Sequence, residues 1–183
     1  MVSATRDRVE GTLARIRRAD SSVAHSQDAL QRSRYRLHGI RGGAAPELPD
    51  LSRLAVVIVE ANTDNLDVFA TFLRACGARV VGARSVELAL RQLATSPADV
   101  IMTDVSVLPL GGAQFIEAVR GIPHHQMTPI VAVTGWTEKD VRPAECGFTA
   151  FLQKPVDLDH LGAEILRLSR AGAGAVVASH DAA

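Results

Sequence analysis

Short apolar runs alternate with helix-spaced stretches from about residue 54 to residue 170. The runs occupy residues 54–59, 78–83, 99–104, 129–134 and 148–154. They are rich in β-branched residues and apolar throughout rather than alternating, which is typical of parallel strands buried on both faces. The pattern therefore predicts five buried strands.

Helical spacing fills the intervals between these runs. The first interval repeats apolar residues at Leu66, Phe69, Leu73 and Cys76. A helix around 137–145 is limited by Pro143, because proline interrupts a helix interior. Five strands alternating with helices predict an α/β domain over residues 54–170, with a doubly wound parallel sheet of flavodoxin-like order 2-1-3-4-5.

A different pattern occupies residues 1–40. Large apolar residues recur every seven positions without a gap, at Val2, Val9, Ile16, Val23, Leu30 and Leu37. Mostly small or hydroxylated residues lie three positions after each of them. This is the period of a coiled coil, so we expect a helical arm that forms a homodimer. An amphipathic helix folded back on its own domain is the alternative.

Glycine and proline separate this arm from the α/β domain. Residues 41–50 read RGGAAPELPD, which favours an extended connection, so we interpret residues 41–53 as a linker. Residues 171–183 read AGAGAVVASHDAA, with no charge pattern and no long apolar side chains, which predicts a flexible tail.

Composition and charge narrow the function classes. Hydrophobic residues make up 47% and charged residues 22% of the 183 residues, as in soluble globular proteins. The first 50 residues hold nine Arg against six acids, a net charge of +3, with one Tyr and no Trp or Phe, which is too sparse for a DNA-binding surface. No run approaches the roughly 20 residues of a membrane span, and MVSATRDRVE lacks a signal-peptide core, so we expect a cytoplasmic protein with no membrane partner.

Candidate chemistry gathers where the predicted strands end. Glu60 follows the first run, Asp104 and Thr134 close the third and fourth, and Lys154 closes the fifth. In such a sheet ligands bind outside the carboxyl ends of the strands, so these side chains should share one edge. A carboxylate beside a lysine stays ionised and is a competent nucleophile toward phosphorus, forming an aspartyl phosphate.

The residues that mark other common kinds of functional site are missing from the sequence. No glycine-rich phosphate loop follows the first strand, which disfavours a dinucleotide or flavin enzyme. No Cys/His set has zinc spacing, and no nucleophile elbow is present. His124 and His125 precede a strand in a polar stretch, and we interpret both as solvated. Cys76 and Cys146 are interpreted as small buried residues.

Residues 54–170 resemble the receiver domain of response regulators in two-component signal transduction. VVIVEANTDNL is similar to the family's first strand and its acidic end, and ADVIMTDVSVLPLGG to its phosphoacceptor strand and loop. PIVAVTG supplies the threonine, and FLQKP supplies the Lys-Pro pair. The resemblance leaves the arm unexplained.

The resemblance implies a role for several residues. Asp104 would accept a phosphoryl group, and Mg²⁺ would be held by Glu60, Asp104 and the backbone carbonyl of Ser106. Thr134 and Lys154 would bind the phosphoryl oxygens.

The same resemblance implies a switch. Phe151 would turn inward when the threonine moves toward the phosphoryl group, and the peptide bond between Lys154 and Pro155 would be cis.

Three residues depart from the family pattern. Ala61 stands where the second acid is expected, so Mg²⁺ binding should be weak. Leu108 stands where proline is usual, and Trp136 is unusually large for a position beside the site.

The resulting hypothesis is an atypical single-domain response regulator. A histidine kinase or phosphotransfer protein would phosphorylate Asp104, and the signal would pass on by protein–protein interaction with an output protein. The chain would be no enzyme beyond its own phosphorylation and dephosphorylation. The alternative is a degenerate receiver that acts as a constitutive interaction module without phosphorylation.

Overall fold

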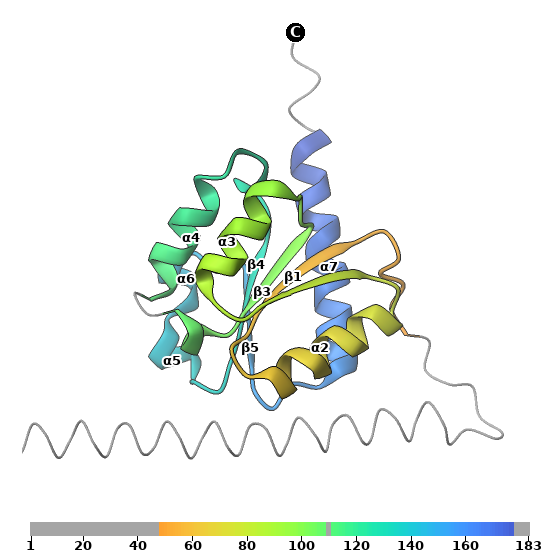
Figure 1. Ribbon diagram of the computed structural model, residues 1–183, viewed down its shortest axis with the longest axis horizontal. Helices are drawn as coiled ribbons and strands as arrows, with labels where there is room; N and C mark the ends of the chain where they lie inside the picture. Colours follow the sequence, from red (N-terminus) through yellow and green to blue (C-terminus); the bar gives the residue numbers. More distant parts are fainter. Residues whose placement is uncertain (1–47, 109–110, 178–183) are drawn as a thin grey trace, which may run out of the picture.

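A computed structural model describes residues 48–108 and 111–177 of the chain, with side chains up to residue 171. The predicted arm, most of the linker and the end of the predicted tail lie outside these residues. The described chain forms a five-stranded parallel sheet in the order β2-β1-β3-β4-β5, which confirms the predicted fold class (Figure 1).

The strands are short and begin close to the predicted positions. They are β1 (Ala55–Val59), β2 (Arg79–Ala83), β3 (Val100–Thr103), β4 (Ile130–Thr134) and β5 (Ala150–Gln153). Val59 at the end of β1 pairs with Ala83 of β2 and with Thr103 of β3. This register brings the carboxyl ends of the three strands side by side.

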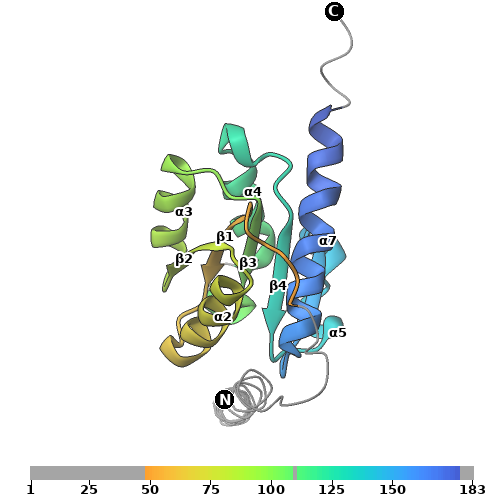
Figure 2. The same cartoon turned by 90° about the vertical axis from the view of Figure 1, so that its right-hand side faces the viewer.

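Helices cover both faces of the sheet. They are α2 (Thr63–Ala75), α3 (Val86–Thr95), α4 (Gly112–Arg120), α5 (Glu138–Val141), α6 (Pro143–Cys146) and α7 (Leu158–Val177), with short 3₁₀ turns η1 (Val105–Val107) and η2 (Pro123–His125). Figures 1 and 2 show α2 and α7 on one face and α3 and α4 on the other. The predicted helix around 137–145 is two single turns, because Pro143 begins a new helix after the left-handed Arg142.

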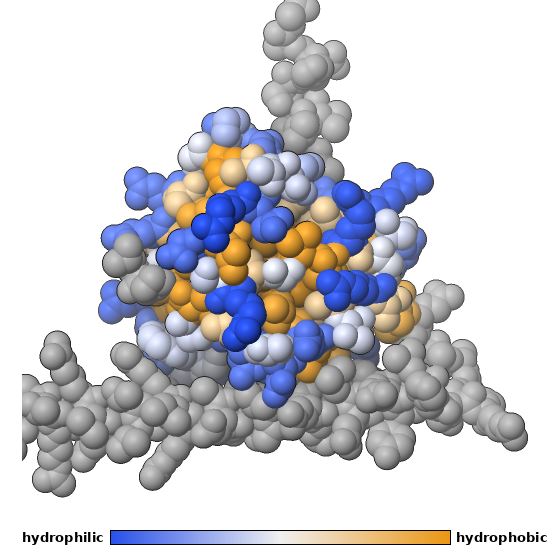
Figure 3. All heavy atoms as spheres, viewed as in Figure 1, coloured by the Kyte–Doolittle hydropathy of each residue, from blue (hydrophilic) through white to orange (hydrophobic). Residues whose placement is uncertain are grey.

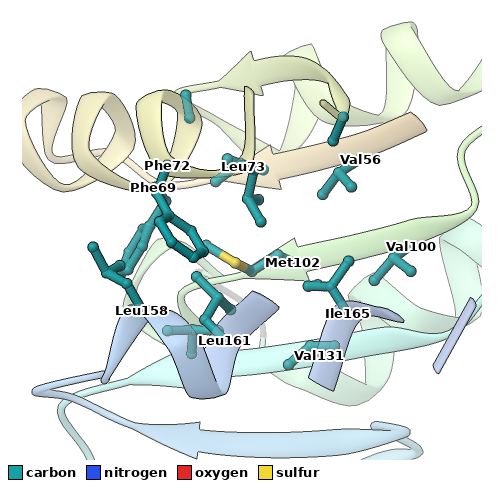
Figure 4. Packing of buried hydrophobic residues seen from close by; sticks show 14 of the residues in the cluster. Val56, Phe69, Phe72, Leu73, Val100, Met102, Val131, Leu158, Leu161 and Ile165 are labelled. Atoms are coloured by element: carbon teal, nitrogen blue, oxygen red, sulfur yellow. The ribbon is translucent and has the colours of Figure 1, made fainter. Parts of the chain in front are cut away.

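Two apolar clusters fill the space between the layers. Phe69 and Leu73 of α2 meet Leu161 and Ile165 of α7 over Met102 of β3 (Figure 4). On the other face, side chains of α3 and α4 pack on the sheet with contributions from α5 and α6. Cys76 is buried as predicted, and burial raises the pKa of its thiol to about 11, so the thiol stays protonated near neutral pH.

The last residues of the predicted linker are seated on this core. Leu51 has no exposed surface, and its backbone N–H donates to the carbonyl of Cys76 at 2.9 Å. Gly162 of α7 provides the space for Pro49, since a Cβ there would lie 2.6 Å from the proline ring. The first described residues, from Leu48 on, therefore lie on the α2 and α7 side of the domain.

The prediction that His125 is solvated is wrong. Its side chain is completely buried, and its Nε2 lies 3.1 Å from the carbonyl oxygen of Leu93 near the end of α3. Its Nδ1 lies 3.0 Å from Thr128 Oγ1. Hydrogen bonds to the end of a helix satisfy the ring without water, and a local sequence pattern does not show them.

The surface mixes polar and apolar side chains. Figure 3 shows the face that carries α2 and α3, where apolar residues lie among hydrophilic ones. Val81 on the edge strand β2 is 39% exposed, and Leu88 on α3 is 41% exposed.

Candidate functional site

The predicted site residues come together at the carboxyl edge of the sheet. Glu60 directly follows β1, and Asp104 directly follows β3. The backbone N–H of Asp104 donates to the carbonyl of Val59 at 2.9 Å, which fixes the two acids as neighbours. Lys154 follows β5 on the far side of β4 and donates its backbone N–H to the carbonyl of Thr134 at 2.8 Å.

Lys154 joins the two acids through its side chain. Its Nζ lies 2.6 Å from Glu60 Oε2 and 2.8 Å from Asp104 Oδ2. The lysine and both acids are buried. The ring of Phe69 on α2 covers the ammonium group, with 5.8 Å between Nζ and the ring centroid. Three charged groups thus share one cleft that is largely shielded from water.

Burial and charge act in opposite directions on these groups. Burial raises the pKa of Glu60, although the charge of Lys154 opposes this shift. Burial also disfavours the ammonium form of Lys154, but the charges of Asp104 and Glu60 outweigh it and raise the pKa of the lysine. Lys154 is therefore a permanent cation near neutral pH.

The remaining oxygen of each acid accepts a backbone hydrogen bond. Glu60 Oε1 accepts from the N–H of Asn62 at 2.9 Å, and Asp104 Oδ1 accepts from the N–H of Ser106 at 2.9 Å. The first contact comes from the loop that caps α2, since Asn62 is its N-cap. The second comes from η1, whose N-cap is Asp104 itself. Both carboxylates are therefore held at both oxygens by protein donors.

The other predicted residues surround this cluster at different depths. Thr134 is fully buried at the end of β4, and its Oγ1 accepts from the N–H of Trp136 at 3.4 Å. Phe151 on β5 is partly buried against the apolar cluster of the α3 and α4 face. The peptide bond between Lys154 and Pro155 is cis.

One residue that the sequence analysis passed over lies beside the cleft. Arg84 follows β2, and its Nε donates to the carbonyl of Ala61 at 3.3 Å. The N–H of Glu60 donates to the carbonyl of Ala83 at 3.0 Å, so the end of β2 is fixed next to the residues after β1. The predicted strand order contained this signal, because it makes the ends of the first two strands neighbours.

Binding of Mg²⁺ by Glu60, Asp104 and the carbonyl of Ser106 stays a prediction, and the two acids already share the ammonium group of Lys154. The part of the chain that the structure describes holds no group of three or more His, Cys, Asp or Glu side chains arranged to bind a metal ion. Of the two carboxylates present, each already gives one oxygen to Lys154 and one to a backbone N–H. The residue after Glu60 is Ala61, whose methyl group offers no oxygen to a hard cation.

Within residues 48–108 and 111–177, no helix has the length and apolar character needed to cross a bilayer.

Comparisons with known proteins agree with this fold. The family model of the response regulator receiver domain matches residues 56–166. The sensor histidine kinase GacS of Pseudomonas protegens is 31% identical over 117 residues, which cover 61% of this chain and 13% of the kinase. The chain therefore matches only a small part of that relative's length.

Solved receiver domains share the architecture. The chemotaxis response regulator CheY4 of Vibrio cholerae is 27% identical with a TM-score of 0.58, covering 63% of this chain and 98% of that one. The receiver domain of a sensor histidine kinase of Pseudomonas aeruginosa, with a magnesium ion coordinated in its active-site cleft, is 23% identical with a TM-score of 0.58, covering 64% of this chain and 98% of that one. With a family match over more than half of its length, this chain belongs to the response regulator receiver domain family of two-component signalling.

Proposed function

We propose that the chain is a cytoplasmic phosphoacceptor whose Asp104 takes a phosphoryl group from a histidine kinase or a phosphotransfer protein. The observation that carries this proposal is the buried contact of 2.8 Å between Lys154 Nζ and Asp104 Oδ2. The lysine places a positive charge beside the acid, whose carboxylate form is the nucleophile toward phosphorus. Membership of the receiver family supports the same role.

The transfer requires little from the protein beyond position and charge. A carboxylate oxygen of Asp104 forms a bond to phosphorus while the bond between phosphorus and the donor imidazole nitrogen breaks. The leaving nitrogen keeps the electron pair of that bond and takes a proton from water. Lys154 Nζ stabilises negative charge on the phosphoryl oxygens, and the hydroxyl of Thr134 donates to one of them.

The output is a change of surface that a partner protein recognises. When the hydroxyl of Thr134 turns toward the phosphoryl group, space opens beside β4 and the ring of Phe151 on β5 moves inward. Thr134 and Phe151 lie on adjacent strands, since Thr134 pairs with Gln153 and Ala132 with Phe151. The arm formed by residues 1–40 is proposed to join two copies of the chain as a homodimer, from its heptad pattern.

Phosphorylation is tested by intact mass. Wild type and Asp104→Asn are incubated with phosphoramidate, with and without MgCl₂. We expect one added phosphoryl group in wild type and none in Asp104→Asn, because an amide is a poor nucleophile. Asp99→Asn is the matched control, since Asp99 precedes the same strand at the opposite edge of the sheet. Absence of labelling in wild type would contradict the proposal and favour a constitutive interaction module.

A further inference from the structure

The segment that leads into the domain is seated in a notch between α2 and α7. Residues 48–51 form this segment, which we call the strap. Gly162 of α7 makes room for it, because a Cβ at position 162 would lie 2.6 Å from Cγ of Pro49 and 3.2 Å from the ring of Phe72. Glycine in a helix interior is less stable than alanine, so α7 gives up helix stability at this position and gains the seat for the proline.

The same two helices border the acceptor cleft. Phe69, three residues before Phe72 on α2, covers the ammonium group of Lys154 at 5.8 Å. Leu158, the first residue of α7, is four residues after Lys154 and four residues before Gly162. Figure 4 shows Phe69, Phe72 and Leu158 in one apolar cluster. The cleft and the notch are therefore joined by one set of packed side chains.

We infer that the strap is an autoinhibitory element: seated in its notch, it favours the arrangement of α7 and Lys154 that holds the free carboxylate of Asp104, and its release favours phosphorylation. This inference rests on the proposed function and adds a regulatory contact to it. Coupling between two sites is reciprocal, so phosphorylation of Asp104 also favours release of the strap.

The direction of the effect follows from the contacts of Lys154. Its Nζ bridges Glu60 and Asp104 at 2.6 and 2.8 Å. Once Asp104 carries a phosphoryl group, the ammonium group pairs with the phosphoryl oxygens and leaves this position. The start of α7, four residues later, and the ring of Phe69 adjust with it. Because the notch fits Pro49 in the present arrangement, such an adjustment weakens the seat.

The strap is held in a way that allows part of it to open. At its end, the N–H of Leu51 donates to the carbonyl of Cys76 at 2.9 Å, and Leu51 has no exposed surface. The ring of Pro49 is held by packing against Gly162 and Phe72. Release of this ring breaks no hydrogen bond, because the ring carries no donor or acceptor. The strap can therefore leave the notch without unfolding the domain.

Full-length variants test the inference by the rate of labelling with phosphoramidate and MgCl₂. Pro49→Ala removes the ring from the notch, and Gly162→Ala fills the notch with a methyl group. Each should label about fivefold faster than wild type, a coupling at the low end of the usual range. The double variant should be no faster than either single variant, because both changes release the same contact.

Two matched controls should keep the wild-type rate. Arg53→Ala changes an exposed residue that follows the strap. Gly121→Ala adds a methyl group at the end of α4, where a Cβ would make only ordinary contacts at 3.4 Å or more.

Hydrogen exchange measures the coupling in the reverse direction. The N–H of Leu51 should exchange about fivefold faster in phosphorylated wild type than before labelling, relative to peptides from β4. Lys154→Met gives the same readout without phosphorylation, because it removes the ammonium group beneath Phe69. Exchange at Leu51 should rise in this variant relative to β4, and Lys139→Met should leave it unchanged.

The outcomes separate the two proposals. Wild type that labels, with Pro49→Ala and Gly162→Ala that label no faster, overturns the autoinhibitory role and leaves the proposed function intact. Unchanged exchange at Leu51 in Lys154→Met overturns the coupling between the cleft and the strap. No labelling of wild type overturns the proposed function, and the autoinhibitory role with it.

Discussion

At the scale of single residues, Lys154 is the centre of the acceptor cleft. It is buried together with two acids, and each of them would be costly to bury without a positive charge nearby. Glu60 already has a raised pKa because burial disfavours its charged form, even with the lysine in place. The ion pairs thus stabilise the arrangement of the cleft more than they stabilise the fold.

Replacing Lys154 alone should nevertheless destabilise the folded protein, because its two acidic partners would stay buried without a cation. We expect Lys154→Met to lower the free energy of unfolding at neutral pH by about 3 kcal/mol, because two buried carboxylates lose their shared cation. Chemical denaturation followed by circular dichroism measures the change. Lys139→Met is the matched control, since Lys139 is the other lysine of the chain and is exposed. Similar losses for both variants would contradict the central role of Lys154.

Sequence reasoning reached most of this cleft for a physical reason. In a parallel sheet every strand delivers its last residue to the same edge, so Glu60, Asp104 and Lys154 could be placed together from the apolar runs alone. Arg84 was passed over because it follows the second strand, and only the ends of the other four strands were considered as candidate site residues. The hydrogen bond from its Nε to Ala61 depends on a side-chain direction that no periodicity encodes.

At the scale of elements, a second buried polar cluster lies between the end of α3, the turn η2 and the residues before β4. His125 contacts the carbonyls of Leu93 and Ser96, and Arg120 Nη1 donates at 2.7 Å to the carbonyls of both His125 and Thr128. The turn is held by these contacts, since η2 itself is a single 3₁₀ turn.

This cluster should make stability depend on pH. Burial lowers the pKa of His125, and the nearby charges of His124 and Arg120 lower it further, against the two carbonyls that favour protonation. The unfolded chain then binds a proton near pH ~6.5, which the folded chain takes up only at lower pH. The free energy of unfolding should therefore fall as the pH drops below ~6.5, by up to about 1.4 kcal/mol per pH unit.

Urea unfolding at several pH values measures this slope. His125→Gln should show a shallower loss of stability on acidification than wild type, whatever its stability at neutral pH. His124→Gln should change the slope only slightly, because the charge of His124 is a smaller cause of the lowered pKa of His125 than burial is. Equal slopes for wild type and His125→Gln would contradict the proposed linkage.

The elements show where sequence patterns stop being informative. The strands were predicted well because burial on both faces makes each one a continuous apolar run. The burial of His125 was not predicted, because its partners are the carbonyls of Leu93 and Ser96, about thirty residues earlier in the chain. Pro143 indicated an interruption of the helix around 137–145, which is divided into α5 and α6. The left-handed conformation of Arg142 between them could not be predicted from the sequence.

At the scale of the whole molecule, the open question is how the segment before residue 48 is used. The structure shows where that segment attaches: Leu48, Pro49 and Leu51 pack against the cluster shared by α2 and α7. These residues belong to the folded unit. A truncation that tests the arm should therefore begin the chain at Leu48 and keep Leu51 in its site.

The heptad pattern of residues 1–40 predicts that the full chain is a dimer and that the chain beginning at Leu48 is a folded monomer. Light scattering coupled to size-exclusion chromatography measures both masses, and circular dichroism checks the fold. Within the full chain, Val23→Glu should shift the dimer toward monomer, because it places a charge in the apolar column. Ala24→Glu, one position outside the column, is the matched control and should leave the mass unchanged. A monomeric full chain would instead favour an arm that folds back on its own domain, and the loss of mass on truncation would then be that of the arm alone.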